Sequence, residues 1–199
     1  MVENSFLYPC IFQEQLSEEW NEDLDQMECF VLEGRKFVRL PEEEIGHFYS
    51  SDCYVFLCRY WVPPEEGEDE DLDDEEEEEE KEDDLQCVVY FWEGRDSGNM
   101  GWLTFAFSLR KKFEALFGDK LEVIRTRQQQ ESLKFLSHFK GTFVVEKGRR
   151  KQTEPDTSAK LFEIRSTMGK LTRRCLQCEC NATQLNANFP FVLKVIIYI

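Results

Sequence analysis

Short runs of β-branched and aromatic residues alternate with polar turns along most of the chain, and the pattern changes to a helical period in two places. The apolar runs predict strands, because each is bounded by glycine, proline or acidic residues. The predicted strands cover residues 29–33, 36–40, 53–61, 85–92, 121–125 and 143–146. Residues 99–117 and 131–139 instead predict one long and one short helix.

The long predicted helix carries more apolar residues than one sheet contact needs. One stripe has the spacing of a face that packs on a sheet, and it comprises Trp102, Phe105, Ala106, Leu109, Phe113 and Leu116. A second stripe lies beside it and comprises Met100, Leu103, Thr104 and Phe107. The surplus indicates either packing against a further element or a docking face.

The chain divides into one nearly complete unit and a shorter remainder. Residues 1–20 form an N-terminal extension, and residues 21–152 hold the strands and helices described above. A polar, basic linker precedes residues 158–199, where strands are predicted at 161–165, 172–180 and 191–195 without any helix. These last strands are therefore expected to form an orphan set with unpaired edges that packs loosely on the first unit.

The net charge of −17 comes almost entirely from one segment. Residues 65–84 hold 17 acidic residues and one lysine, which leaves 24 acidic and 23 basic residues elsewhere. Like-charge repulsion predicts a disordered insert over residues 63–84, either as a solvated spacer or as a tail for a basic partner. The rest of the chain lacks the basic excess of a nucleic-acid-binding surface.

The cellular setting follows from the cysteines and the apolar runs. Eight cysteines in 199 residues are too few for a disulfide scaffold, and the first ten residues lack the pattern of a secretory signal. No apolar run is long enough to span a bilayer. We expect reduced thiols in a cytosolic or nuclear protein.

Several segments resemble the gelsolin, severin and villin repeat. The segment GHFYSSDCYVFL is similar to the entry into the central strand of that repeat. The segments DDLQCVVYFWEGRDSGNMGWLTFAFSLRKKFEALF and RQQQESLKFLSHFKGTFVVEKGRRK, with the acidic insert, most resemble the fourth gelsolin-like repeat of flightless homologues. The resemblance covers residues 17–195 and implies an α+β fold. Its central mixed sheet of about five strands would lie between one long and one short helix, followed by an incomplete second repeat.

The resemblance also implies a calcium site, and calcium is the one cofactor that it implies. Ser51 would offer its carbonyl and Asp52 its carboxylate, which suits a hard cation. Gly98 or Asn99 stands where the family has a bidentate glutamate, so the strongest ligand is missing. The alternative is that Asp52 caps a turn before the strand.

Actin is the partner that the resemblance implies. Repeats that bind actin lay the long helix into a cleft of actin, and this assigns the contact to Met100, Leu103, Thr104, Phe107 and Lys111. Arg110 and Lys111 replace an acidic pair, so a calcium-independent contact is expected. The implied function is actin filament capping, severing and organisation by a monomer. The alternative is a scaffold for transcriptional coactivators or signalling proteins.

The remaining motifs point away from an enzyme. His47 and His138 lack a nucleophile with an orienting third group, and Cys175, Cys178 and Cys180 lack a second ligand pair for zinc. A basic segment could contact phosphoinositide headgroups or be a solvated linker, and it comprises Lys147, Arg149, Arg150 and Lys151.

Overall fold

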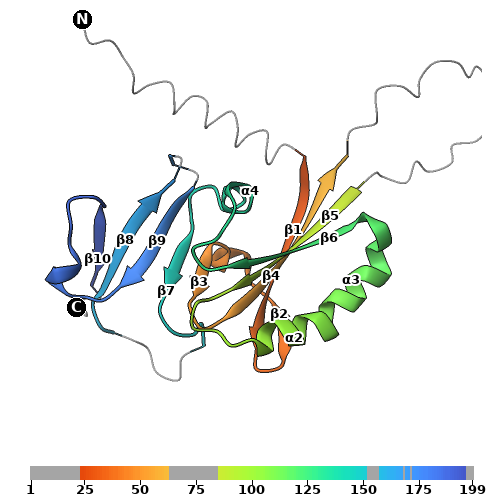
Figure 1. The fold of residues 1–199 in the computed structure, drawn as a ribbon, viewed down its shortest axis with the longest axis horizontal. Helices are drawn as coiled ribbons and strands as arrows, with labels where there is room; N and C mark the ends of the chain where they lie inside the picture. The colour runs from red at the N-terminus through yellow and green to blue at the C-terminus, as the bar shows by residue number, and fades with distance from the viewer. Residues whose placement is uncertain (1–22, 63–84, 152–156, 168, 171, 196–199) are drawn as a thin grey trace, which may run out of the picture.

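The computed structural model describes residues 23–62, 85–151, 157–167, 169–170 and 172–195. The predicted acidic insert and the predicted N-terminal extension lie outside these residues. The helices and strands form two five-stranded sheets with helices packed on the first sheet (Figure 1). The elements are β1 (Leu24–Glu33), β2 (Lys36–Arg39), η1 (Glu42–Glu44), β3 (His47–Tyr49), β4 (Cys53–Trp61), β5 (Leu85–Glu93), α2 (Met100–Phe107), α3 (Leu109–Phe117), η2 (Gly118–Lys120), β6 (Leu121–Arg127), α4 (Leu133–Ser137), β7 (Val144–Glu146), β8 (Lys160–Ser166), β9 (Arg173–Cys178), η3 (Ala182–Gln184) and β10 (Phe191–Lys194).

The first sheet is mixed and has the order β2-β1-β4-β5-β6. Its strands pair antiparallel except β5 and β6, which pair parallel because α2 and α3 form the crossover between them. Phe105 of α2 and Phe113 of α3 pack on one face of this sheet, and Phe135 of α4 packs on the other. The α+β class, with a central five-stranded mixed sheet between a long helical segment and a short helix, is confirmed.

Strands β4 and β5 form the centre of the molecule because both of their faces are covered. Along β4, Tyr54 and Phe56 face the cluster beneath α4, while Val55 faces the cluster beneath α2 and α3. All three side chains are essentially inaccessible to solvent. This explains why the sequence of β4 is a continuous apolar run and not an alternating one.

Strand β3 is an element that the sequence pattern did not predict as separate. Phe48 at its centre is 1% exposed, and its ring lies 4.4 Å from that of Phe143 and 4.7 Å from that of Trp92, measured between centroids. Three further rings, of Tyr54, Phe56 and Phe139, lie within 5.7 Å. Phe48 is therefore the hub of the aromatic core between the two sheets.

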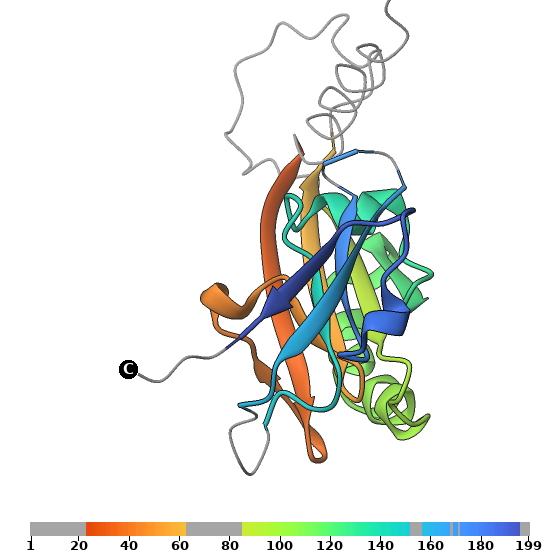
Figure 2. The same cartoon turned by 90° about the vertical axis from the view of Figure 1, so that its left-hand side faces the viewer.

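The second sheet corrects the expectation of orphan strands at the end of the chain. Its order is β10-β8-β9-β7-β3, so the late strands β8, β9 and β10 extend a ladder begun by β3 and β7 (Figure 2). Strand β9 pairs parallel with β7, with Val145 opposite Leu176. Leu176 is 7% exposed and belongs to the same core cluster as Phe48. Strand β9 thus pairs with the edge of β7 that β3 leaves free, and β8 and β10 continue the sheet.

A buried carboxylate adds a polar connection between the two sheets. The side chain of Glu131 is 1% exposed and accepts a hydrogen bond of 3.0 Å from the indole N–H of Trp92 on β5. Its other oxygen lies 3.1 Å from a guanidinium nitrogen of Arg174 on β9. The backbone N–H of Gln129 also donates to Glu131, at 2.8 Å. One carboxylate thus joins the central sheet to a late strand.

Candidate functional site

Helix α2 is apolar on two opposite sides, as the sequence predicts. Phe105 is fully buried on the sheet side. On the outer side, Met100 is 70% exposed, Leu103 43% and Phe107 71%. These three residues, together with Thr104, are called the outer stripe below. The large apolar side chains of the outer stripe thus remain exposed among the described residues, which leaves them available for contact.

Gly101 determines how closely α2 approaches the sheet. A Cβ atom at this position would lie 2.4 Å from the Sγ atom of Cys53 on β4, which no side chain can tolerate without movement. The absence of a side chain lets the first turn of α2 rest directly on β4. This contact fixes the helix so that its sheet side takes Phe105 and its outer side presents the outer stripe.

The long predicted helix is interrupted at Ser108. This residue has φ −116° and ψ −81°, outside the helical region, and separates α2 from α3. Its hydroxyl and its backbone N–H both donate to the carbonyl of Thr104. A serine that competes for a backbone acceptor in this way commonly bends a helix.

The interruption changes which residues of α3 face outward. Phe113 is buried on the sheet, as expected, but Leu116 is 73% exposed. The prediction that Leu116 packs on the sheet is wrong, because the break at Ser108 shifts the helical phase after α2. Leu116 is an exposed apolar residue that sequence reasoning missed for this reason.

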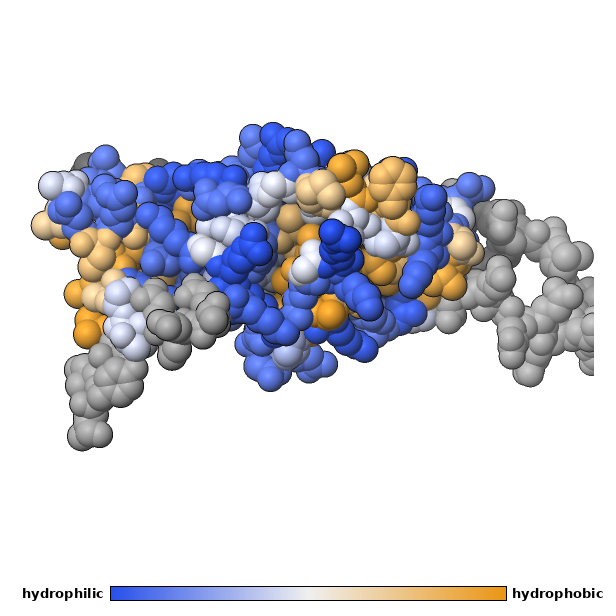
Figure 3. Space-filling model, turned by 90° about the horizontal axis from the view of Figure 1, so that it is seen from below, coloured by the Kyte–Doolittle hydropathy of each residue, from blue (hydrophilic) through white to orange (hydrophobic). Residues whose placement is uncertain are grey.

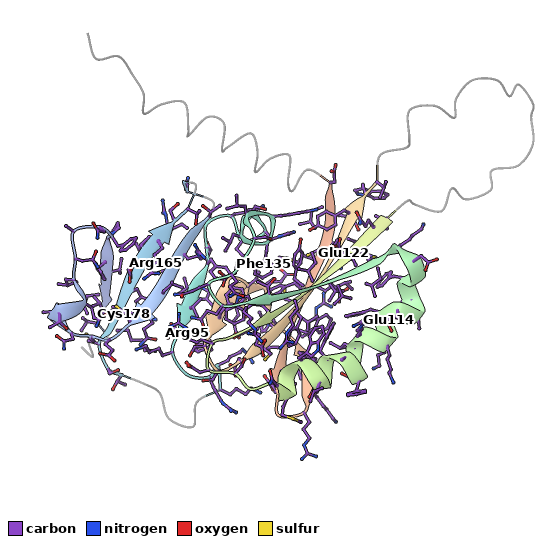
Figure 4. All side chains as sticks on the ribbon, in the orientation of Figure 1. Arg95, Glu114, Glu122, Phe135, Arg165 and Cys178 are labelled. Atoms are coloured by element: carbon purple, nitrogen blue, oxygen red, sulfur yellow. The ribbon has the colours of Figure 1, made fainter. Side chains whose placement is uncertain are left out.

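The other predicted contact residues take part in interactions within the helices. The Thr104 hydroxyl donates to the Met100 carbonyl at 2.8 Å. The Lys111 ammonium lies 5.7 Å from the centroid of the Phe107 ring, close enough for a cation–π contact. Arg110 pairs with Glu114, whose side chain is labelled on α3 in Figure 4, at 2.7 Å. Lys111 therefore adds a positive charge directly beside the most exposed residue of the outer stripe.

The two residues expected at a calcium site lie near the basic segment. One Asp52 carboxylate oxygen accepts a hydrogen bond of 2.7 Å from the backbone N–H of Arg150, and the Asp52 carbonyl accepts one from Gly94. The Ser51 N–H donates to the Gly148 carbonyl at 2.9 Å. Burial raises the pKa of the Asp52 carboxyl, against the lowering effect of the Arg150 N–H and the nearby arginines.

This donor set does not fit a calcium ion. Calcium takes six to eight oxygen ligands, usually with several carboxylates. Within the described residues, no group of three or more Asp, Glu, His or Cys side chains could hold a metal. The structure instead uses Asp52 as a tertiary clamp that holds the segment around Arg150 against the entry into β4.

The basic segment is tied to carboxylates of earlier elements. The Arg150 guanidinium binds Glu44 through two nitrogens, at 2.5 and 2.7 Å, and Glu33 through the third, at 2.7 Å. Its hydrogen bonds to Glu44 lower the pKa of that carboxyl. Lys151 also binds Glu33, at 2.6 Å. Of the four cations assigned to phosphoinositide, these two already have carboxylate partners, with which a lipid phosphate would have to compete.

His138 is buried in the core and has a defined hydrogen-bonding arrangement. Its Nδ1 atom lies 3.1 Å from the Phe135 carbonyl, and its Nε2 atom lies 2.6 Å from the Tyr60 hydroxyl. The neutral ring satisfies both contacts, with Nδ1 donating and Nε2 accepting. Burial lowers the pKa of His138.

We expect His138 to make stability depend on pH. The unfolded chain binds a proton near the ordinary histidine pKa of about 6.5, whereas the folded chain binds it only at lower pH. The free energy of unfolding should therefore decrease as pH falls below about 6.5. Urea unfolding at several pH values should show a shallower decrease in His138→Gln. Equal slopes in His138→Gln and the parent chain would contradict the assignment.

Comparison with curated proteins shows strong similarity over almost the whole chain. The chain is 55% identical to the mouse flightless-1 homolog over 204 residues, which cover 94% of this chain. It is 51% identical to flightless-1 of Drosophila melanogaster over 200 residues. The chain is therefore similar to flightless-1 proteins over almost its whole length. The resemblance that the sequence segments indicated is thereby confirmed.

The chain spans only part of the length of these relatives. It corresponds to 16% of the length of both the mouse and the Drosophila proteins.

Mouse advillin is 24% identical over 172 residues, which cover 85% of the chain. A solved complex of Thorarchaeota 2DGel3 with rabbit actin has 14% identity and a TM-score of 0.40, and it covers 84% of this chain and 71% of that one. No protein-family model matches the chain, and no described helix could cross a membrane.

Proposed function

We propose that this chain is an actin-binding module and that the outer stripe of α2 is its contact surface. The observation that carries the proposal is the exposure of Met100, Leu103 and Phe107 on a helix whose opposite side is already buried. Their i, i+3 and i+7 spacing suits a helix lying in an apolar groove. The resemblance to the gelsolin, severin and villin repeat points to actin as the protein that offers such a groove.

The charge near the outer stripe supports the same contact. Lys111 lies over the Phe107 ring at the end of α2, and Arg110 follows Ser108 at the start of α3. Basic residues beside an apolar anchor favour an acidic protein surface around the groove. Because the residues around Asp52 do not fit calcium, the contact should form with or without this ion.

Within longer flightless proteins, this module would contribute to capping, severing and organisation of filaments at the cytoskeleton. The chain alone should bind monomeric actin or cap a filament end, because severing requires several linked modules to engage one filament together. No catalytic step is part of the proposal.

Phe107→Asp tests the contact directly. We expect the substitution to weaken binding to actin at least roughly ten-fold, because it places a carboxylate in the centre of an apolar anchor and removes the contact with Lys111. Pyrene-actin assembly and co-sedimentation, each with calcium and with EGTA, measure the effect. Folding should be unaffected because Phe107 is 71% exposed.

Leu116→Asp is the matched control, because it adds the same charge at an exposed leucine of α3 outside the outer stripe. It should bind actin like the parent chain. Equal binding by Phe107→Asp and parent would refute the outer stripe as the contact surface. If the parent chain itself does not bind actin at micromolar concentration, the scaffold function replaces the actin-binding one.

A further inference from the structure

Strand β6 is an edge of the first sheet, beside helices α2 and α3. It pairs parallel with β5, and no described strand pairs with its other side. The N–H of Gln128, just after β6, donates to the Glu93 carbonyl at 2.8 Å, so the backbone of Gln128 faces β5. Alternate residues of a strand bond opposite neighbours, so the residues of β6 that direct their N–H and C=O groups away from β5 are Leu121, Val123, Arg125 and Arg127.

The side chains of these outward residues share the face of the sheet that the helices cover. At the start of β6, a cavity of about 580 Å³ lies between the strand and the helices. Leu121 and Val123 line it from β6, and Trp102 and Glu114 line it from α2 and α3. Its volume is within the range of about 300–1,000 Å³ found for ligand pockets. The start of the edge therefore combines outward backbone groups with a partly apolar cavity.

The end of β6 borders a second cavity, which is polar and basic. It has a volume of about 340 Å³, and Arg95, Ser97 and Arg127 line it. The Arg127 side chain is 62% exposed and lies 3.5 Å from Glu93, which also binds Arg125 at 2.9 Å. Arg127 can therefore take a further carboxylate. The two cavities and the edge of β6 between them are called the β6 groove below, and Figure 4 labels Glu114 and Arg95 at its two ends.

We propose that an extended segment of another protein pairs with the edge of β6 and occupies the β6 groove. Its backbone bonds the N–H and C=O groups that β6 directs outward, as strands do when they add to a sheet edge. Two apolar side chains at alternate positions contact Leu121 and Val123, and an acidic side chain four residues further along binds Arg127. The ligand is therefore an extended peptide with apolar residues toward one end and an acidic residue at the other.

A second copy of β6 does not supply this pattern. Antiparallel pairing about Ile124 places Arg127 opposite Leu121 and Arg125 opposite Val123, so each arginine faces an apolar residue. Parallel pairing in register places arginine opposite arginine, which is destabilising. The arrangement of apolar and basic residues along the groove thus favours an acidic partner over a second copy of this chain.

The β6 groove is separate from the outer stripe. Neither cavity is lined by a residue of the outer stripe. Figure 3 shows the molecule from the side on which α2 lies, and hydrophobic residues reach the surface there among hydrophilic ones. The peptide contact therefore goes beyond the proposed actin contact and does not depend on it.

Two synthetic peptides test the proposal, with binding measured by fluorescence anisotropy of a terminal label. One has the order leucine, threonine, leucine, threonine, threonine, lysine, glutamate, and the other has the reverse order. They match parallel and antiparallel pairing with residues 121–127, and both are capped so that the termini carry no charge. At least one order should bind the parent chain with a dissociation constant of roughly 100 μM or tighter. If neither binds at roughly 1 mM, the proposal is overturned.

A charge exchange tests the basic end of the groove. Arg127→Glu should weaken binding of the peptide at least roughly ten-fold, and replacing the peptide's glutamate by lysine should restore binding to this variant. Arg35→Glu is the matched control, because Arg35 is an exposed arginine in the turn between β1 and β2 and should leave binding unchanged. Circular dichroism should show that Arg127→Glu folds, since Glu93 keeps its contact with Arg125. Equal binding of the glutamate peptide by Arg127→Glu and parent would overturn the proposal.

Methylated peptides test the backbone pairing without any change to the protein. Two versions of the bound peptide carry N-methyl groups on alternate backbone nitrogens, one version on each set. Only one set of N–H groups faces β6, so one version should lose binding and the other should keep it. If both versions bind alike, the peptide does not pair with the edge of β6, and the proposal fails.

Discussion

Replacing Arg174 by alanine should destabilise the protein by about 3–5 kcal/mol, the usual cost of removing one partner from a buried ion pair. The side chain of Glu131 is 1% exposed and that of Arg174 15%, so water cannot replace the guanidinium. The loss leaves the Glu131 carboxylate beside Trp92 without its cationic partner in the core between the two sheets. Urea unfolding followed by tryptophan fluorescence measures the change in the free energy of unfolding.

A neighbouring arginine supplies the control for this prediction. Arg165 lies directly opposite Arg174 in the β8–β9 register, but its side chain is 43% exposed where it pairs with Glu163. Arg165→Ala should cost less than about 1 kcal/mol, as exposed ion pairs do. Adding Glu131→Gln to Arg174→Ala should recover part of the loss, because the amide keeps an acceptor for Trp92 without the charge. Equal losses for the two arginine variants would show that Glu131 does not couple the sheets.

Phe48→Ala should cost about 3–5 kcal/mol, as expected for truncating a phenylalanine in a packed core. Phe48 is 1% exposed and is surrounded by five aromatic rings from β4, β5 and the segment between α4 and β7. Truncation leaves a cavity that these rigid rings cannot fill without leaving their rotamers. A reduced urea midpoint at unchanged slope is the expected result.

Phe107→Ala makes the same chemical change at a residue that is 71% exposed. It should alter stability by no more than about 0.5 kcal/mol. If Phe48→Ala were equally mild, β3 would not be the hub of the aromatic core, and the pairing of β3 with β7 would contribute little.

The sequence predicted the elements whose own residues form a clear apolar pattern. Strand β4 has the bounds expected from its apolar run, and β5 differs by a single residue at its end. The two apolar sides of α2 were also visible in the sequence, because residues at helical spacing filled both stripes. The outer stripe is exposed, so the predicted contact with actin has an accessible surface. The contact itself remains a proposal.

Other features depend on contacts that leave no local pattern. Strand β3 has three residues, too few for a period to show, and it exists because β7 pairs with it. The parallel pairing of β9 with β7 depends on which edge is free after the first unit has folded. Arg150 binds Glu33, Glu44 and Asp52, which are all distant from it in sequence. The sequence alone therefore predicted Asp52 only as a calcium ligand or as the cap of a local turn.

The ladder β3-β7-β9 has a consequence for how the chain acquires its structure during synthesis. Phe48 is translated early, but its strand pairs with residues 144–146, and Leu176 closes the same core later still. Because distant pairings form slowly, nascent chains should expose this aromatic hub until the residues up to Leu176 have left the ribosome. Chaperone capture at this stage should therefore cease only after Leu176 has emerged.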